Sequence, residues 1–173
     1  MRHGESQANA AGVIAGQSDS PLSGLGQKEA EEAGRDLRAR GMKFDVILSS
    51  PLSRAHETAR IIAQAVGYPL DKIIVIDDLK EKGSGDFEGK PPELVFAASE
   101  EAIVRAGVES FDATAERVRR ANAEIATYAH GTTLIVGHAA FYRMARCVHD
   151  GAPPSEMLHM RKPRNATLVE YPL

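Results

Sequence analysis

Residues 44–67 read FDVILSSPLSRAHETARIIAQAVG, in which a short apolar run leads through a Ser-Ser-Pro turn into a helical pattern. The run 44–48 has the composition of a strand that is buried on both faces. The helix expected over 53–66 is stopped by Gly67, a residue type that commonly ends helices. A strand followed directly by a helix is the repeating unit of α/β proteins, so this stretch decides the fold class.

The same alternation continues on both sides of this stretch, without internal repeats or low-complexity linkers. Further strands are expected at 73–76, at 133–136 and, as a closing edge strand, at 166–171. Further helices are expected at 26–40, 93–106, 113–128 and 139–149, with a polar, glycine- and proline-rich loop at 80–92. The sequence therefore predicts an α/β fold with a mostly parallel sheet sandwiched between helices.

Composition favours one globular domain covering residues 1–173, since 43% of the residues are hydrophobic and 26% are charged. The formal net charge of −3 gives no reason to expect nucleic acid or an anionic membrane as a partner. No signal-peptide pattern opens the chain, and no apolar run approaches the roughly 20 residues of a membrane-spanning helix. The single cysteine, Cys147, is expected to be a buried, inert thiol. These features predict a cytoplasmic protein.

Polar side chains follow each of the expected internal strands. Open α/β sheets bind ligands beyond the carboxyl ends of their strands. The groups delivered to that edge are Arg54 after 44–48, Glu81 after 73–76 and His138 after 133–136. If Arg2 and His3 lie at the same edge, two arginines, two histidines and one acid converge on a single pocket.

Arg2-His3-Gly4 has the residue types that phosphoryl transfer requires. An arginine presents a planar fork of donors to phosphate oxygens, and a neutral imidazole can attack phosphorus. The glycine would let the backbone pass close to a ligand. Taken alone, the tripeptide is equally compatible with a solvated surface pair.

Four segments, in order along the chain, resemble motifs of the histidine phosphatase superfamily in its phosphoglycerate-mutase-like branch. They are RHGESQAN at 2–9, SSPLSRAHETA at 49–59, LKEKGSGDFEG at 79–89 and VGH at 136–138. The resemblance covers nearly the whole chain. It implies the phosphoglycerate-mutase-like fold and a phosphomonoester hydrolase that works through a phosphohistidine, without metal or other cofactor.

The resemblance also implies a role for individual residues. His3 would be the nucleophile, Arg2 and Arg54 would clamp the phosphate oxygens, and His138 would be a second phosphate-binding histidine. Glu81 would be the general acid, although Glu5, Asp86, Glu88 and the aspartates at 77–78 remain alternatives. Further contacts to the phosphate are expected from Ser6, Asn9, Gly16, Gln17 and the amide of Ala139.

Other polar residues have structural interpretations. His56, His130, His149 and His159 lack acidic partners at metal-ligand spacing, so no metal site is expected. Ser49 and Ser50 lack the glycine pattern of a serine-hydrolase nucleophile elbow.

Two features depart from the family pattern. Members of the family usually carry a hydrophobic strand before the arginine-histidine pair, whereas only Met1 precedes it here, and we interpret the N-terminus as incomplete or mis-assigned. The cap insertion around 82–112 is short. Its part from 90 to 112 holds Arg105 as its only arginine, and Ser84 stands where an aromatic residue would follow the acid. A short cap favours hydrolysis over the mutase reaction.

Two alternatives remain open at this stage. One is a cofactor-dependent phosphoglycerate mutase, which would require a bisphosphoglycerate primer. The other is a catalytically inactive phosphate-ester binding module, which the lack of a first strand favours. The partners expected are a small phosphomonoester substrate and inorganic phosphate as product, and the sequence is compatible with a homodimer.

Overall fold

The structure, a computed structural model, describes residues 1–171. Its sheet has three parallel strands in the order β2-β1-β3. Their bounds are Val46–Ser49 for β1, Ile74–Val75 for β2 and Thr133–Val136 for β3. In register, Leu48 of the central strand lies opposite Ile74 on one side and Ile135 on the other. The predicted α/β fold with a parallel sheet is confirmed.

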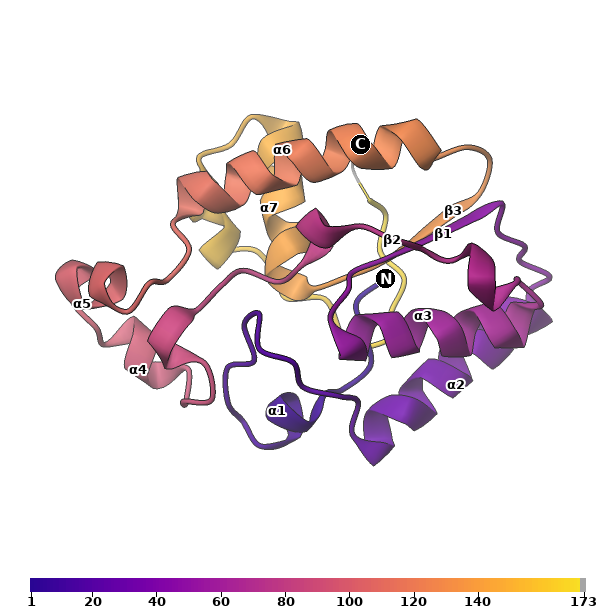
Figure 1. Ribbon diagram of the computed structural model, residues 1–173, viewed down its shortest axis with the longest axis horizontal. Helices are drawn as coiled ribbons and strands as arrows, with labels where there is room; N and C mark the ends of the chain where they lie inside the picture. Colours follow the sequence, from indigo (N-terminus) through magenta and orange to yellow (C-terminus); the bar gives the residue numbers. More distant parts are fainter. Residues whose placement is uncertain (172–173) are drawn as a thin grey trace.

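Four long helices cover the two faces of this sheet (Figure 1). They are α2 (Gly24–Ala39), α3 (Ser53–Val66), α6 (Phe111–Tyr128) and α7 (Ala139–Asp150). Successive residues of a strand point to opposite faces. Accordingly, Val46 and Leu48 pack with residues of α6 and α7, whereas Ile47 packs with residues of α2 and α3. The central strand is therefore buried on both faces, as its composition predicted.

The remaining elements are short. They are α1 (Gln7–Ala10), α4 (Glu93–Phe96) and α5 (Glu100–Arg105), with 3-10 turns η1 (Leu70–Lys72), η2 (Asp77–Leu79), η3 (Gly85–Phe87) and η4 (Pro154–Leu158). Helices α4 and α5 project at one end of the molecule, away from the sheet (Figure 1). Along residues 1–171, no helix is both long and apolar enough to cross a membrane.

The predicted helix boundaries at 53–66 are confirmed, and the cause of the helix end is visible. Gly67 adopts φ 76°, a left-handed conformation that ends α3. At the start of α2, the Ser23 side chain accepts a hydrogen bond from the Gly26 amide and caps the helix. Local capping interactions therefore mark the end of α3 and the start of α2.

Two predicted elements are wrong. The helix predicted over 93–106 is divided into α4 and α5, because the Ser99 side chain accepts a hydrogen bond from the Ala102 amide and starts a new helix there. The strand predicted over 166–171 does not form. Ala166 has φ 47°, which turns the chain, and its amide bonds to the His3 carbonyl rather than to a strand.

Where members of the family usually have a first strand, residues 1–3 form a single bridge beside β3. The Gly137 amide donates to the Met1 carbonyl at 3.0 Å, and the His3 amide donates to the Gly137 carbonyl at 3.0 Å. The α-amine of Met1 donates to the Ile135 carbonyl at 2.6 Å. This short parallel pairing is sufficient to place His3 at the carboxyl end of the sheet.

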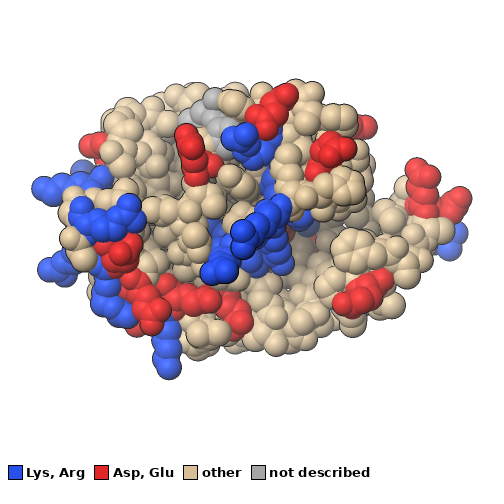
Figure 2. Space-filling model, turned by 180° about the vertical axis from the view of Figure 1, so that it is seen from behind, with Lys and Arg blue, Asp and Glu red and all other residues tan. Residues whose placement is uncertain are grey.

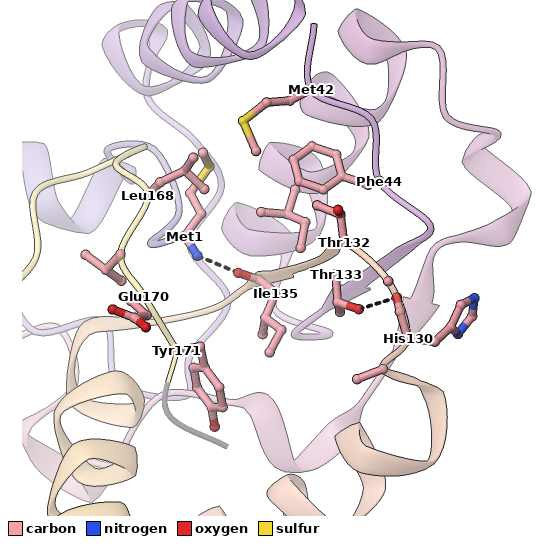
Figure 3. A pocket seen from close by; sticks show the side chains of 14 residues that line it. Met1, Met42, Phe44, His130, Thr132, Thr133, Ile135, Leu168, Glu170 and Tyr171 are labelled. Atoms are coloured by element: carbon pink, nitrogen blue, oxygen red, sulfur yellow. Dashed lines mark hydrogen bonds between the residues drawn. The ribbon is translucent and has the colours of Figure 1, made fainter. Parts of the chain in front are cut away.

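A groove of about 560 Å³ runs along the outer edge of β3, beside the Met1 amine (Figure 3). Met42, Phe44, Leu168 and Tyr171 are among its apolar side chains. The Met1 amine points at the Ile135 carbonyl inside this groove. The groove therefore adjoins the first residue of the chain.

We predict that a polypeptide with a free Met1 amine loses stability as the pH falls from 8 to 5. Burial lowers the pKa of this amine to about 5 from its ordinary value of 8.0. Between these values the unfolded chain binds the proton and the folded chain does not, so stability rises with pH. The free energy of unfolding should therefore fall by about 4 kcal/mol as the pH falls from 8 to 5. Urea unfolding measured at several pH values checks this slope.

The control is the same protein extended before Met1 by roughly five to seven apolar, β-branched residues, a usual strand length. The extension replaces the amine by a peptide group and fills the groove. It should remove this part of the pH slope and raise the stability. Identical unfolding curves for both proteins at every pH would contradict both expectations.

Candidate active site

The polar residues predicted from the strand exits lie together at the carboxyl edge of the sheet. His3 and His138 are both buried, with 3% and 2% of their surfaces exposed. Their ring centroids are 5.1 Å apart and their planes are tilted by 59°. Arg2 and Arg54 are also buried and act electrostatically on both histidines. The four groups therefore form one cluster.

The His3 ring is fixed in position and is electrically neutral. Its Nδ1 lies 2.6 Å from the Gly4 carbonyl, so Nδ1 carries the hydrogen and Nε2 keeps its lone pair. Burial, the His138 ring and two nearby arginines hold the pKa of His3 well below its ordinary value of 6.5. A neutral imidazole with a free Nε2 can act as a nucleophile.

The backbone around His3 is held from two sides. The His3 carbonyl accepts hydrogen bonds from the Asn165 side chain at 3.0 Å and from the Ala166 amide at 3.2 Å. Gly4 approaches α2 so closely that a Cβ on it would lie 2.3 Å from the Gly26 carbonyl oxygen. This glycine is thus required by helix packing, a reason different from the ligand approach expected from the sequence.

The His138 ring is also electrically neutral. Burial and the positive charges of Arg54, Arg2 and Arg117 lower its pKa well below the ordinary value. Its Nε2 lies 2.8 Å from the Ser50 hydroxyl, which already accepts from the Leu52 amide. The hydroxyl hydrogen has no other acceptor within residues 1–171, so we assign it to the bond with Nε2, which leaves the ring hydrogen on Nδ1. That Nδ1–H is buried and has no partner among residues 1–171.

Arg54 and Arg2 are oriented mainly by main-chain carbonyls. Arg54 donates to Gly16 at 2.7 Å and to Ser18 at 3.1 Å, while Arg2 donates to Pro163 at 2.9 Å. The Nε atoms of both arginines are buried without a partner in the described chain. Arg54 is only 1% exposed, so it does not lie on a solvated first turn of its helix.

The Glu81 carboxylate lies against the N-terminus of α7. Its Oε1 accepts from the amides of Ala140 at 3.0 Å, Phe141 at 3.2 Å and Lys82 at 3.0 Å. Its Oε2 accepts only from Ala140, at 3.3 Å, and is the less committed oxygen. The first amide of the helix, that of Ala139, has no acceptor in the part of the chain that the structure describes.

The other acids near the site are engaged elsewhere. Burial alone would raise the pKa of Glu88, but hydrogen bonds from Ser18, Gln17 and Ser84 lower it below its ordinary value. Glu5 accepts from the Ser23 hydroxyl at 2.7 Å. The aspartates at 77 and 78 form ion pairs with a lysine and an arginine on the surface.

The four supporting residues expected from the resemblance have mixed positions. The Asn9 Oδ1 accepts a hydrogen bond from Arg2 at 3.4 Å. The Ser6 side chain caps α1 by accepting from the Asn9 amide. Gly16 offers its carbonyl to Arg54, and the Gln17 amide is taken by Glu88 at 2.8 Å. Asn9 and Gly16 thus support the arginines, and the Gln17 amide is not free for a ligand in this arrangement.

Sequence reasoning missed a buried ion pair that holds the Glu81 loop. Arg117 of α6 donates to Glu109 through Nε at 2.8 Å and Nη2 at 2.9 Å. Arg117 also donates to the carbonyls of Asp78 and Lys80 at 2.8 Å each and to that of Glu81 at 3.3 Å. The one available signal was an arginine on the face of a predicted helix that is otherwise apolar.

A comparison with family models identifies the family. The model of the histidine phosphatase superfamily (branch 1) matches residues 1–172. The chain belongs to this superfamily. The resemblance carried by the four motifs is confirmed.

Individual relatives of this histidine phosphatase superfamily member differ in their named activities. Phosphoglycerate mutase of Schizosaccharomyces pombe is 42% identical over 88 residues, 51% of this chain and 42% of that protein. The matched part thus spans less than half the length of that mutase. PhoE of Bacillus subtilis, named as an uncharacterized phosphatase, is 32% identical over 155 residues, 88% of this chain and 77% of that protein. The crystal structure of the alpha-ribazole phosphatase from Shigella flexneri has a TM-score of 0.78 at 30% identity, covering 95% of this chain and 84% of that chain.

We predict that Arg117→Met destabilises the protein by about 3–5 kcal/mol, because Glu109 would be left partly buried and unpaired. Arg120→Met is the matched control on the same helix. Arg120 pairs with Asp78 at the exposed surface, so its loss should cost less than about 1 kcal/mol. Urea unfolding of the two variants measures the difference.

A second variant separates the ion pair from simple packing. Replacing Arg117 and Glu109 together by methionine should recover part of the stability, because no unpaired charge then remains. Equal destabilisation by Arg117→Met and Arg120→Met would show that the buried pair does not hold the loop.

Proposed function

We propose that this superfamily member is a phosphomonoester hydrolase in which His3 accepts the phosphoryl group. One observation carries the proposal. Three buried donors beside His3, namely Arg2 Nε, Arg54 Nε and His138 Nδ1, have no partner within residues 1–171. Leaving a buried donor unpaired costs about 1–3 kcal/mol each. A tetrahedral anion that accepts from all three removes this cost and places phosphorus beside the nucleophile.

In the proposed first step, His3 Nε2 attacks phosphorus while the bond from phosphorus to the leaving oxygen breaks. Charge in such a transition state is spread over the three equatorial oxygens. The arginines and His138 donate to these oxygens, and the free Ala139 amide adds a donor at the N-terminus of α7. Because the donors are fixed beforehand by carbonyls and by Ser50, little reorganisation accompanies the reaction.

Glu81 is proposed to move the proton. Its Oε2 would give a proton to the leaving oxygen as the alcohol departs. In the second step the same carboxylate would take a proton from water as the water oxygen bonds to phosphorus. Breakage of the bond from phosphorus to nitrogen then releases inorganic phosphate and restores His3. These steps use protein groups and water alone.

Hydrolysis is favoured over the mutase reaction by the segment 82–112, which we propose to be a short cap. A mutase must hold its product while the phosphoryl group returns to another oxygen of that product. The residues from 90 to 112 include only Arg105 as an arginine, at the end of the short helix α5. A pair of arginines to hold a carboxylate is thus lacking there, and we expect water to reach phospho-His3.

We predict that the protein, mixed with a ³²P-labelled phosphomonoester and quenched in base, retains label on His3. The label should be stable in base and labile in acid, as a phosphohistidine is, and should chase into inorganic phosphate. His3→Ala should carry no label. A labelled His3→Ala protein would move the nucleophile elsewhere, and no label in either protein would support a binding module.

A product assay distinguishes a hydrolase from a mutase. With 3-phosphoglycerate and a catalytic amount of bisphosphoglycerate, a hydrolase accumulates inorganic phosphate if it accepts the compound. Clean conversion to 2-phosphoglycerate, with negligible phosphate, would replace the proposed hydrolysis by mutase activity.

Glu81→Gln tests the acid. The variant should lose about 10² to 10⁴ in rate with alkyl phosphates, a typical contribution of general acid–base catalysis. In single-turnover phosphorylation by para-nitrophenyl phosphate the loss should be much smaller, because that leaving group needs little protonation. Equal losses with both substrates would assign the proton transfer to another group, with Asp86 the next to examine.

A further inference from the structure

The peptide group between Gly4 and Glu5 connects the ring of His3 to a carboxylate on α2. Its carbonyl accepts the Nδ1 hydrogen of His3 at 2.6 Å. Its N–H donates to the Glu29 carboxylate at 2.7 Å. Both distances are at the short end for N–H···O bonds, and a carboxylate acceptor makes such a bond stronger. A continuous chain of two hydrogen bonds therefore joins the Glu29 carboxylate to the His3 ring.

Close packing of this loop on the first turn of α2 brings Glu29 to the peptide. A Cβ on Gly26 would overlap the Glu5 carbonyl, and a Cβ on Gly4 would overlap the Gly26 carbonyl. Residues three apart on a helix lie on the same face, so Glu29 follows Gly26 on the face that meets the loop. The position of Glu29 beside the Glu5 amide is therefore a consequence of backbone packing between two glycines.

An ion pair does not explain why Glu29 lies near the candidate site. Among residues 1–171, none of the ion pairs includes Glu29. Burial lowers the pKa of Arg2, and the charges of Glu81 and Glu29 act against this effect. Figure 2 shows basic side chains around a hollow at the centre of one face, as expected of a surface that attracts anions. A negative charge near a phosphate site opposes the binding of an anion, so the position of Glu29 is explained by the peptide that it holds.

We propose that Glu29 is a positioning residue that fixes the orientation and the tautomer of the His3 ring through the Gly4–Glu5 peptide. The proposal rests on the proposed function, in which His3 is the nucleophile. The hydrogen bond made by one ring nitrogen decides the state of the other. As Nε2 bonds to phosphorus and the leaving oxygen departs, Nδ1 keeps its hydrogen and the ring becomes positively charged. The Gly4 carbonyl stabilises this charge, and it is the stronger acceptor because its own peptide N–H donates to a carboxylate.

The tautomer of His3 provides a test that needs no enzymatic activity. Long-range ¹H–¹⁵N spectra of labelled protein distinguish a ring nitrogen that carries hydrogen from one that does not, and comparison with His3→Ala assigns the signals. The parent protein should carry the hydrogen on Nδ1. Glu29→Ala should give a mixture with hydrogen on Nε2, whereas Glu29→Gln, which keeps an acceptor oxygen, should resemble the parent. Hydrogen on Nε2 in the parent, or an unchanged tautomer in Glu29→Ala, would overturn the proposal.

Two further variants of α2 and its cap separate this role from the stability of the helix. Ser23→Ala removes the hydroxyl that accepts from the Gly26 amide at 3.0 Å, so it should lower stability and leave the tautomer unchanged. Glu32→Ala removes an exposed acid from the same helix and should change neither property. If Ser23→Ala alters the tautomer as much as Glu29→Ala does, the effect is one of helix stability and the proposal fails.

Kinetics provide the second measurement. In single-turnover phosphorylation by para-nitrophenyl phosphate, Glu29→Ala should be slower by about 10²-fold, the order of loss that a misplaced reacting group causes. Inorganic phosphate should inhibit this variant at least as strongly as the parent, because Arg2, Arg54 and His138 are unchanged and a nearby negative charge is gone. A matching loss of phosphate affinity would contradict the proposal. Absence of turnover in the parent would refute the proposed function, and the tautomer would still decide the role of Glu29.

Discussion

The pair of hydrogen bonds between Gly137 and the first three residues is the interaction on which the site depends. It joins the start of the chain to the end of β3, so that His3 and His138 leave the sheet side by side. The Met1 amine adds a bond to the Ile135 carbonyl, and the turn at Asn165 and Ala166 supports the same backbone from the opposite side. His3, the proposed nucleophile, is thus positioned by two segments remote from it in sequence.

Burial sets the chemistry of the cluster. Burial and the nearby arginines lower the pKa of both imidazoles, so each ring is neutral. Each ring then has one nitrogen without a hydrogen-bond partner. One such nitrogen carries a lone pair and the other a hydrogen. Attack on phosphorus and donation to a phosphate oxygen require these two states. The same residue type therefore supports opposite roles because its hydrogen-bond partners differ.

Much of the fold and the placement of the candidate site residues could be predicted from the sequence, because both follow local patterns. Helix 53–66 has its stop signal beside it, and the convergence of Arg54, Glu81 and His138 follows from the geometry of parallel strands. The Arg117–Glu109 pair could not be predicted, because Arg117 also donates to carbonyls that lie 36 to 39 residues away in the chain. The strand predicted over 166–171 was wrong for a related reason: Ala166 turns the chain and its amide bonds to the His3 carbonyl, a contact between distant residues that the local pattern does not reveal.

The loop at residues 16–18 links two parts of the site mechanically. Its carbonyls accept hydrogen bonds from Arg54, while its amides donate to the Glu88 carboxylate. A displacement of the segment that carries Glu88 would therefore move this loop and weaken its contacts with the Arg54 guanidinium. In the proposed mechanism, release of phosphate would then depend on the position of the Glu88 segment.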